Sequence, residues 1–116
     1  MSALGDKTVL KLNEAKALYS TTSTANTAFY ADATGGDYKM LLMFANASGG
    51  SGNVTIAVGD SPVGAGADLT FAVANGATKG IVLDSGYFKI FKGEHKDKYK
   101  ITTTAQMTVT VVELPQ

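Results

Sequence analysis

The chain contains no cysteine, no tryptophan and no arginine, and it has one histidine among its 116 residues. Without cysteine it can form neither disulfide bonds nor thiolate metal sites, and it has no cysteine nucleophile. Without arginine, and with ten acidic residues balancing ten lysines, it lacks the forked donors and net positive charge that nucleic-acid-binding proteins use. We therefore expect no nucleic-acid partner.

Long apolar runs are also missing. The longest, residues 40–45, is far shorter than the roughly 20 residues that a membrane-spanning helix requires. Residues 1–7 lack the basic segment and the following apolar segment of a signal peptide. We expect no membrane insertion, and a mass of 12.0 kDa fits a single domain over residues 1–116.

The hydrophobic pattern that is present has a period of two residues. Residues 54–58, 69–73 and 107–111 alternate apolar and polar or small side chains, as half-buried strands do. Residues 38–45 are apolar on both faces, which predicts a central strand covered on each side. With residues 8–12 as a first strand, the spacing of turn signals predicts about eight or nine strands. The expected fold is an all-β antiparallel β-sandwich, Ig-like or jelly-roll-like, with an irregular N-terminal segment.

Two glycine-containing segments predict connections between strands. Asn75 and Gly76 favour a type I′ hairpin, because both residues tolerate positive φ. A two-residue turn there would place Phe71 opposite Gly80 in a ladder. Residues 47–52 resemble a flexible linker, but neither side would comfortably bury its own core, so we interpret them as a mobile loop that joins two strands.

The N-terminal region fits the strand pattern poorly. Residues 13–36 are rich in alanine, serine and threonine and only weakly periodic. They are expected to form either a long loop over the sandwich or an arm that orders on a neighbouring molecule. Within them, residues 13–18 could make one short helical turn.

Catalytic candidates are scarce. His95 stands in a polar turn among lysines, and a general base needs a positioned partner and a pocket. A solvated loop is therefore the preferred interpretation of His95. A calcium site in the 60–68 loop is conceivable, but its spacing matches no known calcium loop. We expect no enzymatic activity, no cofactor and no metal site.

The lysines at positions 89, 92, 96, 98 and 100 form the main concentration of charge. One interpretation is a partner-contact loop made by Lys92, His95, Lys96 and Lys98, which would meet an acidic protein surface. The other, favoured interpretation is a soluble hairpin whose lysines keep an edge strand from pairing with other chains.

Several segments together resemble a known group of proteins. They are GNVTIAVGD at 52–60, GADLTF at 66–71, IVLDSGYFK at 81–89, Gly93 with the lysine-rich turn, YKI at 99–101 and VTVVELP at 109–115. This pattern, over about two-thirds of the chain, is similar to the small β-sandwich head decoration (auxiliary capsid) proteins of tailed bacteriophages.

The resemblance implies a non-enzymatic structural protein that reinforces or decorates the outer surface of a phage capsid. Its expected partner is the major capsid protein, it is expected to be made in the cytoplasm of the host bacterium, and a homo-trimer is possible. Tyr19, Phe29 and Tyr30 are candidate capsid contacts, because aromatic residues dominate interface cores. The alternative hypothesis is a tail-fibre or host-surface module that binds glycans.

Overall fold

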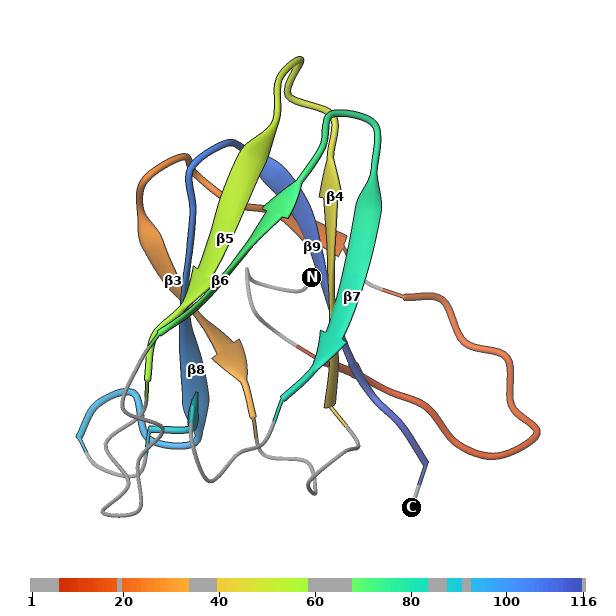
Figure 1. The fold of residues 1–116 in the computed structure, drawn as a ribbon. Coiled ribbons are helices and arrows are strands. Elements are labelled where there is room, and N and C mark those ends of the chain that lie inside the picture. The colour runs from red at the N-terminus through yellow and green to blue at the C-terminus, as the bar shows by residue number, and fades with distance from the viewer. Residues whose placement is uncertain are drawn as a thin grey trace.

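A computed structural model describes residues 7–18, 20–33, 40–58, 68–83, 88–90 and 93–115. The described residues form nine strands in two packed sheets, so the predicted all-β sandwich is confirmed (Figure 1). The strands are β1 (Lys7–Val9), β2 (Ser20–Thr22), β3 (Ala28–Asp32), β4 (Met40–Asn46), β5 (Gly52–Ile56), β6 (Leu69–Val73), β7 (Thr78–Val82), β8 (Lys98–Thr103) and β9 (Met107–Glu113).

The strand pairing follows a nested pattern. Strand β2 pairs with β9, β3 with β8, β4 with β7, and β5 with β6, all antiparallel. Together these four nested pairs form one long hairpin. Folding this hairpin over on itself adds the pairs β4–β9 and β5–β8 and divides the strands into two sheets. Sheet A has the order β1-β9-β4-β7, with β2 also on β9, and sheet B has the order β3-β8-β5-β6. This arrangement is a jelly roll, one of the two sandwich types that the sequence predicted.

Strand β9 carries two short partners along one edge. Strand β1 pairs with residues 111–113 in parallel, and β2 pairs with residues 108–110 in antiparallel. The β1–β9 pair is the one departure from antiparallel pairing among the described strands. The segment between β1 and β2 therefore leaves sheet A and returns to the same edge (Figure 1).

The core lies between the sheets and contains alternate residues of each strand. Leu42 and Phe44 of sheet A are fully buried, as are Val54, Ile56 and Ile101 of sheet B. Residues of β4 and β5 therefore alternate as a pleated strand dictates. The remaining members of the core are Phe29, Ala31, Ala33, Met40, Val73, Leu83, Tyr99, Met107, Val109 and Val111.

The predicted hairpin at Asn75 and Gly76 is wrong. Strands β6 and β7 lie in different sheets, and Gly80 pairs with Met43 instead of Phe71. Only Gly76 has a positive φ, of 83°, and Ala77 N donates to Ala74 O at 2.9 Å. Positive φ at the second central residue alone is the pattern of a type II turn, which here carries the chain from one sheet to the other.

Asn46 forms hydrogen bonds that hold together the end of the sandwich where the 47–51 segment and the 74–77 turn lie. It is 1% exposed, and its Nδ2 donates to Gly50 O at 2.8 Å and to Val73 O at 2.9 Å. Its Oδ1 accepts hydrogen bonds from Ser48 N and Ser48 Oγ. Its backbone N and O bond to the 74–77 turn. The glycine-rich 47–51 segment joins β4 to β5, as predicted, and this one amide ties it to the end of β6.

The interpretation of residues 13–36 as an arm or long loop is wrong for two parts of that range. Residues 20–22 and 28–32 are strands of sheet A and sheet B, respectively. Between them, the buried Ser23 Oγ lies 2.7 Å from Thr103 Oγ1 and accepts a hydrogen bond from Met107 N at 3.0 Å. Strand β3 contributes Phe29 and Ala31 to the core, whereas β2 contributes no core residue and is held by its pairing with β9.

Residues 13–18 do not form the predicted helical turn. They are exposed and without regular structure. Asn13 has a φ of 61° and Glu14 N donates to Lys11 O at 3.4 Å, so a tight turn stands at residues 11–14 instead. Asn tolerates the left-handed conformation that this turn requires.

Candidate functional site

Sheet A carries apolar side chains on its outer face along β4, as well as on its inner face. Leu42 and Phe44 point into the core, so Leu41, Met43 and Ala45 point outward. Leu41 pairs with Val82 on one side and Val112 on the other, which extends the outward row across three strands. We call these five residues the apolar outer face: Leu41, Met43, Ala45, Val82 and Val112. Gly80 belongs to the same side, because a Cβ built there would lie 3.3 Å from Leu41 Cδ1.

The apolar outer face is partly open to solvent. Leu41, Met43 and Ala45 are half-buried and Val82 is 42% exposed, whereas Val112 is 2% exposed. A group of apolar residues on the outer side of a sheet is typical of a surface that meets a partner, since single exposed apolar residues are common but grouped ones are not.

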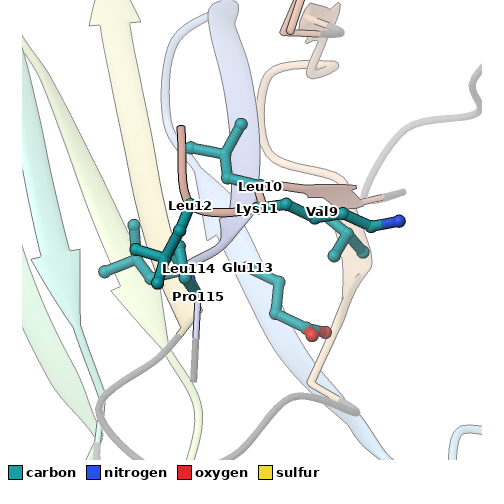
Figure 2. Close-up of a pocket in the computed structure, with 7 residues that line it drawn as sticks. All are labelled: Val9, Leu10, Lys11, Leu12, Glu113, Leu114 and Pro115. Carbon is teal, nitrogen blue, oxygen red and sulfur yellow. The ribbon is translucent and has the colours of Figure 1, made fainter. Parts of the chain in front are cut away.

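A cavity of about 340 Å³ lies beyond the ends of β1 and β9 (Figure 2). By the same alternation, Leu10 and Leu114 extend the outward rows that begin at Thr8 and Val112. Leu10 N donates to Glu113 O at 2.9 Å, which holds the two segments side by side. The lining residues are Val9, Leu10, Lys11, Leu12, Glu113, Leu114 and Pro115.

The outer face of sheet B is polar. Thr55 and Thr70 point outward and their hydroxyls lie 3.1 Å apart. Thr102 pairs with Thr55 and lies on the same face. Lys98 and Lys100 alternate with the buried Tyr99 and are exposed on this side. The two outer faces therefore differ in part. Sheet A carries the aliphatic cluster of β4 and β7 next to hydroxyl side chains of β2 and β9, whereas sheet B carries hydroxyls and ammonium groups.

Tyr30, a candidate capsid contact, and His95, a candidate residue of the partner-contact loop, lie against each other on sheet B. The rings of Tyr30 and His95 stack with their centroids 3.5 Å apart and an interplanar angle of 3°. The His95 side chain is 37% exposed, and its Nε2 lies 4.0 Å from Glu94 Oε2. The interpretation of His95 as a solvated loop residue is therefore incomplete, since Tyr30 covers one face of its ring.

The other predicted contacts are dispersed. Phe29 is 6% exposed and belongs to the core, so it is not available as a surface anchor. Its position follows from the β3–β8 register, which sets Phe29 beside Ile101 on the inner side. Lys96 and Lys98 are exposed, and the turn that carries Lys96 is closed by its N donating to Gly93 O. Tyr19 and Lys92 lie outside the described residues.

The described residues do not assemble a metal-binding cluster. No group of three or more histidine, aspartate or glutamate side chains that could hold a metal ion is present among them. In the proposed calcium loop, Asp68 Oδ1 accepts a hydrogen bond from Val58 N at 2.8 Å, while Asp60 lies outside the described residues. No helix in the described part of the chain is long and apolar enough to cross a membrane.

Comparison with known proteins adds no relative. No protein-family model, no curated protein and no solved structure matches this chain.

The sequence contains a signal for the apolar outer face. Residues 40–45 are apolar at every position, a pattern that predicts a strand covered on both sides. Strand β4 is indeed central in sheet A, but only its inner side is fully buried. The apolar residues of β4 that point outward and are not fully covered by the fold therefore indicate the apolar outer face. The contribution of Val82 and Val112 emerges only from the strand register.

Proposed function

We propose that this protein is a non-enzymatic structural component of a bacteriophage virion that binds the major capsid protein through the apolar outer face of sheet A. The observation that carries the proposal is the contrast between the two outer faces. On sheet A, Leu41, Met43 and Val82 form an apolar cluster beside the threonines of β7 and β9, whereas the outer side of sheet B carries mainly threonines and lysines and has no comparable aliphatic cluster in its described strands.

The contrast supports an oriented docking. Burying apolar surface stabilises an interface by about 25 cal/mol per Å², so the outer face of sheet A is the side that gains from contact. The polar outer face of sheet B then remains in water. On a repeated lattice, a modest contact of this kind acts many times over the same shell.

The identity of the partner rests on the sequence resemblance and on the fold class. Jelly rolls occur in viral capsid proteins and also in lectins, so the fold by itself is compatible with both functions considered for this chain. The apolar outer face favours protein contact, because its outward residues are aliphatic. Glycan sites usually need polar side chains to orient the sugar hydroxyls.

The test uses two edge-strand substitutions of the same kind on opposite faces. Val82→Glu places a carboxylate on the apolar outer face, and Thr70→Glu places one on the outer face of sheet B. Both residues are exposed at strands that edge their sheets, so both variants should fold. Co-sedimentation with purified expanded capsids of the encoding phage measures binding. We expect Val82→Glu to weaken binding by at least about tenfold, since an unpaired charge resists burial, and Thr70→Glu to leave it unchanged.

Two results would overturn the proposal. Equal binding of the two variants would remove the apolar outer face from the contact. Absence of capsid binding by the unmodified chain, together with reproducible affinity on a glycan array that Thr70→Glu reduces, would replace the proposal by the glycan-binding alternative. Deletion of residues 1–36 is unsuitable as a test, because it removes strands from both sheets.

A further inference from the structure

The segment between β1 and β2 projects from the sandwich. It extends away from both sheets in Figure 1, and its residues 11–18 are all exposed. Leu12 is 73% exposed and Leu18 is 43% exposed. With Val82, they are the large hydrophobic residues that stand open to solvent in the described part of the chain. We call residues 11–18 the projecting loop.

A groove lies on the side of the sandwich where β6 and β7 form the edges of their sheets. It has a volume of about 250 Å³ and is lined by Leu69, Phe71, Lys79, Gly80 and Ile81. An apolar cavity of about 150 Å³ already accommodates a benzene ring, so this groove can take a leucine side chain. The register places Lys79 and Ile81 beside Phe44 and Leu42, which directs both toward the space between the sheets.

The projecting loop and the groove lie at opposite edges of sheet A, because β1 and β2 border one side of β9 and β7 borders the far side of β4. Glu14 is the one acidic residue among residues 11–18 and follows Leu12 by two positions, between Lys11 and Lys16, while Lys79 lines the groove. A charge pair between the two surfaces would therefore join this carboxylate to the Lys79 ammonium group. A net charge of zero removes the overall repulsion that would keep copies of the chain apart.

We propose that the projecting loop of one copy binds the β6–β7 groove of a second copy, with Leu12 in the groove and Glu14 paired with Lys79. The contact is heterologous, since each copy contributes a different surface to each of its two neighbours. Repetition of such a contact closes into a ring or continues as an open chain.

Charge exchange tests the pairing on the full chain without any capsid. Sedimentation velocity and native mass spectrometry over a concentration series measure self-association. Glu14→Lys and Lys79→Glu should each lower the association constant by about tenfold or more, because like charges then meet at the contact. An equimolar mixture of the two variants should recover association, since the loop of each variant then faces an opposite charge on the other.

Matched controls separate the pairing from a change of net charge. Glu94→Lys and Lys96→Glu alter the same charges at exposed positions of another turn, and they should associate as the unmodified chain does. Association that is unchanged in Glu14→Lys and Lys79→Glu would refute the contact. So would a mixture that fails to recover, or an unmodified chain that stays monomeric up to about 1 mM, where even a weak contact is populated.

Disulfide trapping gives an independent test, because the chain has no cysteine of its own. Leu12→Cys and Ile81→Cys on separate chains should form a mixed disulfide under mild oxidation. Each variant carries a single cysteine, so every disulfide that forms joins two chains. Disulfides only between identical variants would contradict the proposed geometry.

Discussion

Replacing Asn46 by alanine should destabilise the fold more than any exposed-loop substitution at the same end of the sandwich. The change removes the donor to the buried Val73 O and the donor to Gly50 O. It also removes the acceptor of two hydrogen bonds from Ser48. A buried carbonyl left without a partner costs about 1–3 kcal/mol, and each bond that water can replace costs about 0.5–1 kcal/mol. With one such carbonyl and three replaceable bonds, the expected loss of unfolding free energy is about 2.5–6 kcal/mol.

Urea unfolding followed by circular dichroism measures this loss. The m-value, which is the slope of unfolding free energy against urea concentration, should stay constant if only the native state is affected. For a chain of 116 residues, an unfolding entropy of roughly 2.1 cal/mol/K per residue converts each kcal/mol into about 4 °C. The melting temperature should thus fall by about 10–24 °C.

Ser48→Ala is the matched control for Asn46→Ala. It removes the hydroxyl that donates to Asn46 Oδ1 at 2.7 Å but leaves the amide and both of its carbonyl partners. Because Ser48 is exposed, it should cost less than about 1 kcal/mol. A loss in Asn46→Ala no greater than that in Ser48→Ala would refute the role assigned to the amide.

Two further pairs of variants test the packing. Phe29→Ala should cost about 3–5 kcal/mol, because it opens a cavity in the core, whereas Tyr30→Ala on the outer side should cost about 1 kcal/mol; equal losses by thermal unfolding would contradict the assigned faces of β3. Gly52→Ala should cost about 1–3 kcal/mol, because the new Cβ would lie 2.9 Å from the Cβ of Ala105. Gly50→Ala is the control, because no atom lies within 4 Å of the new Cβ, and it should change stability by no more than about 0.5 kcal/mol. If Gly50→Ala lowers the melting temperature as much as Gly52→Ala does, close packing of Gly52 on Ala105 is refuted.

The positions of β5, β6 and β9 could be predicted because their signal is local. A strand turns alternate side chains to opposite faces, so residues 54–56, 69–73 and 107–111 show their burial in the printed order of the residues. The same holds for the exclusion of thiol chemistry, which depends on composition alone.

The strand β3 and the faces of the candidate site depended on partners far away in the chain. Ala28–Asp32 is a strand because it pairs with β8, about 70 residues later, and no pattern within it predicts that pairing. The same register buries Phe29 and brings Tyr30 under His95. Residue type therefore singles out three aromatic contacts in the sequence, but it cannot tell which of them the sheet turns inward.

The sequence by itself determined the class of fold and the surplus of apolar residues in β4, because both follow from the two-residue period of an extended backbone. Only the tertiary structure decided that Asn75 and Gly76 connect two sheets and that Leu41, Met43 and Val82 share one outer surface. The reason is physical: which strand borders which is set by the nested pairing of eight strands, and that pairing is stabilised by contacts between residues distant in sequence.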